Sequence, residues 1–141
     1  MRAAGYKVGK TFLCRLEHNS NLVRSIEGFA KDKKIKMGVF TALGSVKKAT
    51  LAYYDPKKKI YQKISIDKPL EIVNVFGNIS LKNRKTFSHA HAILSDPSGK
   101  TYGGHLLRAT IFAAEAYIQE LIGGVLEREY DLTTGLALWN L

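Results

Sequence analysis

The sequence has almost no cysteine. Cys14 is the only one among 141 residues, so the chain cannot form an internal disulfide. A single thiol is typical of a reducing compartment, and we therefore expect a cytoplasmic protein. Cys14 follows Thr11-Phe12-Leu13, and this apolar setting favours a packed, inert thiol over a nucleophile.

Long hydrophobic runs are also missing. No stretch comes near the roughly eighteen consecutive apolar residues of a membrane-spanning helix. Residues 1–7 lack the apolar core of a secretion signal, so we expect neither membrane insertion nor secretion. Hydrophobic residues nevertheless make up 45% of the chain, which argues against disorder. This length and composition predict one domain spanning residues 1–141.

Acidic residues are scarce in the first part of the chain. Residues 1–86 carry 19 basic and 6 acidic side chains, residues 87–141 carry 3 and 6, and the net charge is +10. A basic field of this size attracts polyanions. However, the sequence has no helix-turn-helix, aromatic RNA-binding string or Cys/His finger. The alternative to non-specific DNA binding is therefore that these lysines are ordinary solvated surface residues.

The hydrophobic pattern predicts one helix among many strands. Asn19-Ser20-Asn21 offers an N-cap for a helix that begins at Leu22 and reaches Lys33-Lys34. Residues 110–122 fit either a helical stripe or a strand with Ile111, Ala113, Glu115 and Tyr117 on one face. This pattern is typical of an α+β fold, a largely antiparallel β-sheet packed with one or two helices. The strands are expected at residues 12–16, 37–46 (ending in a glycine bend), 48–54, 60–66, 70–81, the segment bearing His89 and His91, and 127–130 paired with 136–141.

Three of the four histidines lie within residues 89–105. Between them, Pro97-Ser98-Gly99 suits a three-residue hairpin loop, because proline favours the first central position of a type I turn and glycine the left-handed position after it. In such a loop Asp96 faces Lys100.

This register determines which histidines share a face. His91 lies directly opposite His105, and His89 lies two residues along the same strand on the same side of the sheet. A two-residue loop would instead place His105 opposite Ala90, on the wrong face. The three-residue loop therefore predicts a metal site.

Three neutral imidazoles suit zinc, with the fourth tetrahedral position open for water. The alternative is that these histidines are ordinary strand residues hydrogen-bonded to carbonyl groups or to one another. His18 stands alone in a loop and is left out of the site. Glu115 is the nearest charged residue in an apolar segment, so it is a candidate base or second-layer partner, or else a solvent-facing position.

Gly103 and Gly104 fall opposite Ile93 and Ala92 in the predicted register. Their missing side chains leave room for a ligand or another subunit. A bulge that shifts the register is the alternative.

Several segments in fixed order resemble the plant- and prokaryote-conserved (PPC, also written PCC) domain, and the similarity spans nearly the whole chain. They are Gly38-Val39-Phe40-Thr41-Ala42-Leu43-Gly44-Ser45, Pro69-Leu70-Glu71-Ile72, Gly77-Asn78-Ile79, His89-Ala90-His91, Gly103-Gly104-His105 and Glu129-Tyr130-Asp131 with Thr134-Gly135-Leu136. In archaea and bacteria this domain occurs as a small stand-alone protein, and in plants it follows an AT-hook.

The resemblance implies an antiparallel sheet packed with helices, a homotrimer, and a strand rather than a helix at residues 110–120. It also implies that His89, His91 and His105 hold a metal ion, most plausibly zinc. The chain has no Arg-Gly-Arg-Pro hook, so minor-groove binding does not carry over from the plant proteins.

The resulting expectation is a metal-binding PPC protein whose precise activity is unresolved, with association with DNA as a candidate role. The alternative is a metal-dependent hydrolase or lyase acting on a small polar substrate through the open coordination position. Catalytic residues are unknown at this stage, and no cofactor beyond the metal ion is expected.

Overall fold

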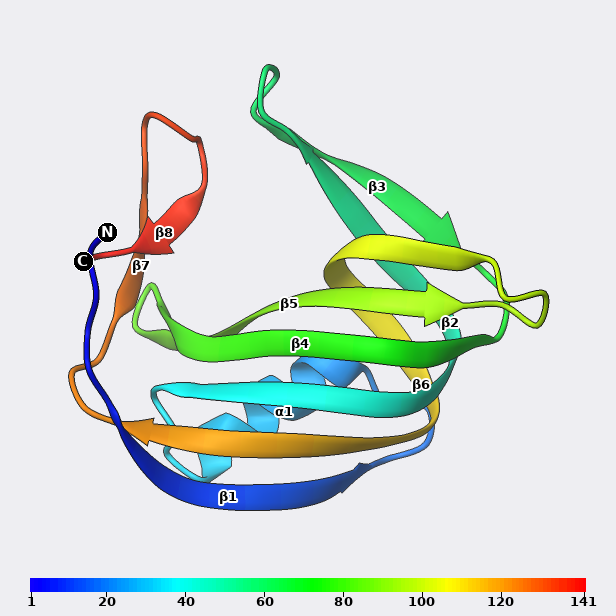
Figure 1. The fold of residues 1–141 in the computed structure, drawn as a ribbon, viewed down its shortest axis with the longest axis horizontal. Helices are drawn as coiled ribbons and strands as arrows, with labels where there is room; N and C mark the ends of the chain where they lie inside the picture. Colours follow the sequence, from blue (N-terminus) through cyan, green and yellow to red (C-terminus); the bar gives the residue numbers. More distant parts are fainter.

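The computed structural model describes residues 1–141 as eight strands and one helix (Figure 1). The expected α+β class, mostly sheet with one helix, is confirmed. The elements are β1 (Lys7–Leu16), α1 (Leu22–Asp32), β2 (Gly38–Asp55), β3 (Ile60–Ile66), β4 (Leu70–Lys82), β5 (Lys85–Ser95), β6 (Thr101–Ile122), β7 (Glu127–Tyr130) and β8 (Ala137–Trp139).

The strand pairings close on themselves. The sheet has the order β3-β2-β6-β5-β4-β7-β8, and β2 additionally pairs with β4, so that β2, β6, β5 and β4 form a ring. All pairings are antiparallel except β4 with β7. β1 lies along the second half of β6. The β2–β3 and β7–β8 hairpins both extend beyond this ring (Figure 1).

Helix α1 forms where the sequence predicts it. The Asn21 side chain accepts a hydrogen bond from the backbone N–H of Arg24 at 3.0 Å, which satisfies one free donor of the first turn. Leu22, Ile26 and Ala30 recur every four residues and are fully buried, so this stripe packs into the core. No helix in the structure is long and apolar enough to cross a membrane.

The expected break within residues 37–54 is wrong, because β2 is a single strand of 18 residues. Its first half pairs with β4 and its second half with β3, while β6 follows it on the other side. Gly44 has φ +125°, and a Cβ there would collide with the backbone of Ala113 and Ala114. Glycine and the nearby register shifts therefore bend the strand without interrupting its ladder.

Residues 110–122 are strand, as the family resemblance implies and against the helical stripe. The buried face is not the one expected from Ile111, Ala113, Glu115 and Tyr117. Ile111 is buried, but beyond it Ala114, Ala116 and Ile118 point inward. The phase changes because the pairing with β2 shifts register around this point, so that one residue is added on β6.

Cys14 on β1 packs against the core as a partly buried side chain. Burial raises the pKa of its thiol, although nearby Lys33 acts in the opposite direction. The thiol is therefore protonated at neutral pH, which agrees with the expected inert role.

Candidate metal centre

The β5–β6 hairpin has the predicted register. Asp96 N–H donates to the carbonyl of Lys100 at 3.0 Å, and Gly99 N–H donates to the carbonyl of Asp96 at 2.9 Å. Gly99 has φ +79°, the left-handed conformation expected of glycine at this position. His91 consequently pairs with His105, and the hairpin prediction is confirmed.

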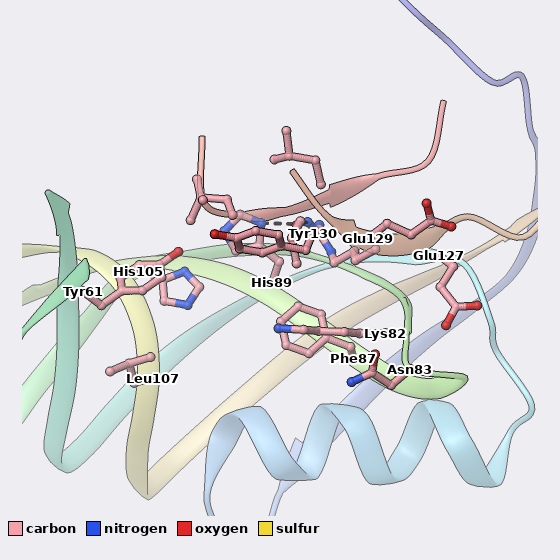
Figure 2. A pocket seen from close by; sticks show the side chains of 15 residues that line it. Tyr61, Lys82, Asn83, Phe87, His89, His105, Leu107, Glu127, Glu129 and Tyr130 are labelled. Atoms are coloured by element: carbon pink, nitrogen blue, oxygen red, sulfur yellow. Dashed lines mark hydrogen bonds between the residues drawn. The ribbon is translucent and has the colours of Figure 1, made fainter. Parts of the chain in front are cut away.

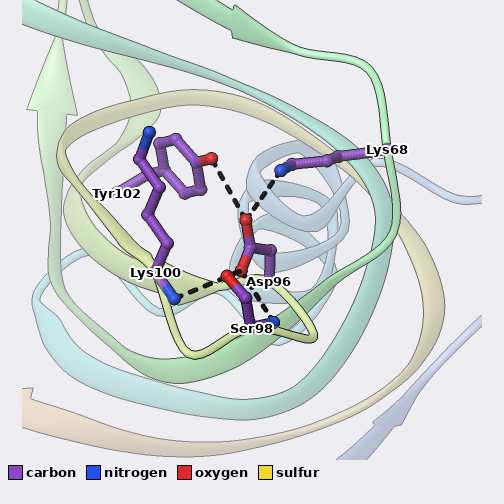
Figure 3. Close-up of polar contacts among 5 residues, drawn as sticks. All are labelled: Lys68, Asp96, Ser98, Lys100 and Tyr102. Carbon is purple, nitrogen blue, oxygen red and sulfur yellow. Dashed lines mark hydrogen bonds and ion pairs between the residues drawn. The ribbon is translucent and has the colours of Figure 1, made fainter.

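The Asp96 carboxylate fixes this turn from inside (Figure 3). It accepts hydrogen bonds from Lys68 Nζ at 2.7 Å, from the N–H and hydroxyl of Ser98 at 3.0 and 2.7 Å, and from Lys100 N–H at 3.2 Å. The Tyr102 hydroxyl donates to its second oxygen at 3.3 Å. The hydrogen bonds from Lys68 and Ser98 hold the pKa of Asp96 well below its usual range. A charged carboxylate with several hydrogen bonds thus stabilises the turn on which the histidine register depends.

The three histidines converge as predicted. Their possible ligand atoms all lie within 4.8 Å of one another. Ring centroids are 5.2 Å apart for His89 and His91, 5.0 Å for His89 and His105, and 5.6 Å for His91 and His105. His91 is exposed and the other two are partly buried, so the cluster lies at the surface of the sheet.

Electrostatics keep two of these rings neutral. Burial, followed by the charge of Arg128 and the neighbouring histidines, lowers the pKa of His89 to about 4. Burial, His91 and Arg128 also lower the pKa of His105. Neutral imidazoles offer the lone pairs that a metal ion needs.

One polar atom at the site has no hydrogen-bond partner. Nδ1 of His105 is buried and unpaired, and no other buried side-chain nitrogen or oxygen in the protein is in this state. Such an atom is costly unless something binds it. A donor set of three imidazoles, one of them with an unpaired ring nitrogen, fits a zinc-like ion.

Arg128 is the charged residue beside the triad, and it is absent from the site predicted from the sequence. Its guanidinium lies 3.4 Å from Nδ1 of His89 and donates to Asn78 Oδ1 at 2.9 Å, to the Ser80 hydroxyl at 3.1 Å and to the carbonyl of Ala137 at 3.0 Å. It is only 9% exposed. No local spacing signals this position, because it arises from the short parallel pairing of β7 with β4.

Glu115 does not take part in the site. In the strand register Glu115 lies opposite Arg15 of β1 and Leu43 of β2, in the half of β6 that is remote from His105. The prediction of a base or second-layer partner at Glu115 is therefore wrong, and the solvent-facing alternative holds.

The two glycines before His105 serve different purposes. A Cβ at Gly104 would meet the carbonyl oxygen of Ala52 at 2.9 Å, so this glycine admits strand β2 rather than a ligand. A Cβ at Gly103 would find only the carbonyl of Ala92, at 3.7 Å. The register opposite Ala92 and Ile93 is continuous, so no bulge interrupts this part of the hairpin.

A cleft of about 700 Å³ adjoins the triad. Figure 2 shows Tyr61 and His105 together at one end and Glu127 at the other. The Tyr61 ring lies 5.1 Å from that of His105. The remaining lining residues are Lys82, Asn83, Phe87, His89, Leu107, Arg128, Glu129, Tyr130, Gly135, Leu136, Ala137 and Leu138.

Comparison with solved structures finds close matches over the full chain. A metal-containing protein from Archaeoglobus fulgidus is 43% identical, with a TM-score of 0.96 and 99% of each chain covered. A plant- and prokaryote-conserved protein from Pyrococcus horikoshii is 33% identical, with a TM-score of 0.94, and the match covers 100% of this chain and 98% of that one. A candidate DNA-binding protein from Bacteroides thetaiotaomicron is 26% identical, with a TM-score of 0.86 and 96% of each chain covered.

The chain also has two similarities at the level of sequence. The chain is 26% identical over 129 residues to the bifunctional protein GlmU of a Synechococcus strain, and it spans only 20% of that protein's length. Residues 3–122 match the family described as the Plants and Prokaryotes Conserved (PCC) domain. The ordered motifs, the closed sheet and this match agree, and the chain belongs to the PCC domain family.

Proposed function

We propose that this protein binds a divalent transition-metal ion, zinc, through His89, His91 and His105. The observation that carries the proposal is the convergence of three imidazoles, one of which has a buried, unpaired ring nitrogen. The metal-containing relative from Archaeoglobus fulgidus supports it.

His89, His91 and His105 would hold the zinc ion, which would supply a Lewis acid that lowers the pKa of a bound water to about 7. The residues of this chain prepare that site. The Asp96 turn holds His91 opposite His105. Burial and Arg128 keep His89 neutral, so no proton competes for its lone pair at neutral pH.

Metal analysis of the purified protein tests this proposal, with His91→Ala as the probe and His18→Ala as the matched control. His91 is exposed, so its removal should leave the fold intact. We expect about one zinc ion per chain in the parent and the control, and little in His91→Ala, because two imidazoles hold zinc weakly. Full metal content in His91→Ala would contradict the proposal.

We further propose a homotrimer that buries the outer face of the sheet. Leu13, Leu43 and Phe76 are 86%, 60% and 60% exposed on this face. The pairings place Leu13, Tyr117, Thr41 and Phe76 side by side across four strands, next to His91. Exposed apolar side chains gathered on one face are typical of a protein interface. Light scattering on the parent and on Leu13→Asp tests it: the parent should have three times the mass of one chain and the variant less, and a monomeric parent would contradict it.

Non-specific association with DNA is a second candidate, which relatives named as candidate DNA-binding proteins support. The concentration of 19 of the 22 basic residues in residues 1–86 favours it. Filter binding on duplex DNA across a salt series provides the test. Affinity should fall steeply with salt because phosphate neutralisation releases counterions. Absence of binding at low salt would remove this candidate.

A further inference from the structure

Two hairpins meet at their tips beside the triad. The Tyr54 hydroxyl at the end of β2 donates to the carbonyl of Thr134, and Lys59 Nζ donates to the carbonyl of Leu132 at 2.7 Å. Gly135 has φ +73°, and a Cβ there would meet the Tyr54 hydroxyl at 2.7 Å. This close approach joins the β2–β3 and β7–β8 hairpins, and residues of both hairpins line the cleft beside the triad.

The cleft has the size and lining of a small-molecule site. Its volume of about 700 Å³ lies within the usual range for ligand pockets. Phe87 lies two residues before His89 on β5, so these two side chains share a face, and Leu107 of β6 lines the same cleft as His105. Leu138 adds an apolar side chain from β8. An organic molecule that reaches the histidines would therefore contact apolar walls.

No negative charge within the histidine cluster balances Arg128 or a metal ion bound there. The cluster of possible metal-binding side chains contains no carboxylate, and Arg128 adds a guanidinium 3.4 Å from His89. The two acidic residues of the cleft do not belong to the histidine cluster: Glu127 accepts from the backbone N–H of Arg84 at 2.7 Å, and Glu129 from Asn140 Nδ2 at 2.8 Å. A divalent cation in this setting favours an anionic fourth ligand, because partly buried positive charge needs a counter-charge.

We infer that this cleft binds a small organic carboxylate, with an oxygen at the open metal position and the apolar body against Phe87, Leu107 and Leu138. The inference rests on the proposed metal centre. It names a ligand class: a carboxylate attached to a compact apolar group, such as an aromatic ring. A neutral amide of the same shape lacks the charge that the site needs.

Cobalt(II)-loaded protein provides the readout, since the visible absorption of cobalt reports its coordination. The probes are acetate, benzoate and the neutral benzamide. Acetate and benzoate should change the cobalt spectrum and benzamide should not. Benzoate should bind at least about tenfold more tightly than acetate, because its ring removes apolar surface from water in the cleft.

Variants assign the binding to the cleft. Leu107→Ala should reduce the preference for benzoate over acetate, whereas Leu121→Ala, a partly buried leucine of the same strand outside the cleft, should preserve it. Leu138→Ala repeats the test at a side chain that is 41% exposed, where truncation poses little risk to folding.

Three outcomes would overturn the inference, and they are distinguishable. Cobalt binding with a spectrum indifferent to carboxylates would overturn it and leave the metal centre standing. Equal affinity for acetate and benzoate would show that the apolar walls of the cleft do not contribute to ligand binding. Failure of the parent to bind cobalt would overturn both the inference and the proposed metal centre.

Discussion

The guanidinium of Arg128 donates to the hydroxyl of Ser80 at 3.1 Å, and the Ser80 side chain has no exposed surface. One end of this pair belongs to β7 and the other to β4, so the bond attaches the C-terminal hairpin to the closed sheet. The same guanidinium lies over the rings of Phe87 and Trp139, with centroids 5.7 and 5.0 Å away.

Replacing Arg128 should therefore destabilise the fold. In Arg128→Met the Ser80 hydroxyl loses its partner, and a buried unsatisfied polar group costs about 1–3 kcal/mol. Urea unfolding should show this loss, while Arg84→Met, an exposed turn arginine, should stay within ~0.5 kcal/mol of the parent. The double variant with Ser80→Ala should lose less than the sum of the two single variants. Full additivity would show that the bond contributes nothing.

Gly77 should not tolerate a side chain. A Cβ there would lie 2.5 Å from the Phe40 ring and 2.8 Å from the carbonyl of His89. Gly77→Ala should lower the free energy of unfolding by about 1–3 kcal/mol, because the backbone of β5 cannot yield without moving His89. The control is Gly28→Ala in α1, where a Cβ meets nothing within 4 Å. That change should stabilise the protein by roughly 0.5–1 kcal/mol, and equal melting temperatures for the two variants would contradict the packing argument.

The Asp96 carboxylate should make the stability of the fold depend on pH in the acid range. Its pKa is depressed in the folded protein, so its contribution is fully present above the unfolded pKa of about 3.9 and is lost as pH falls below it. Asp96→Asn should melt at a lower temperature than the parent at pH 7, and the two curves should converge as the pH falls below about 4. Asp67→Asn is the control, because the Asp67 side chain is 88% exposed and lies 3.9 Å from Lys48. A difference between Asp96→Asn and the parent that is independent of pH would refute the charge-based explanation.

Metal binding should raise the melting temperature. At zinc concentrations about a hundredfold above the dissociation constant, the expected stabilisation is about 2.7 kcal/mol. A chelator should reverse it in the parent. His105→Gln should show neither the gain nor the reversal, whereas His18→Gln should behave like the parent. An equal shift in His105→Gln would place the ion elsewhere.

Local chemistry made the hairpin predictable. Pro97-Ser98-Gly99 determines the loop length, and the loop length determines the pairing of His91 with His105. Asn21 likewise marks the start of α1 through its own side chain. In both cases the deciding atoms lie within a few residues of the feature that they control.

Features set by distant partners were not predictable in this way. Gly44 was expected to end a strand, but the ladders of β4 and β6 on its two sides carry β2 through the bend. Arg128 reaches His89 only because β7 docks beside β4. Glu115 is close to His105 in sequence, yet the extended backbone of β6 carries it away from the centre.

The three histidines and the residues around them come together at different stages of folding. His91 and His105 face one another across a single tight hairpin, and closing a short loop costs little chain entropy. Arg128 and the cleft walls of β7 and β8 join only after distant segments have docked. The imidazoles can therefore capture an ion early, and the pocket around it is completed later in folding.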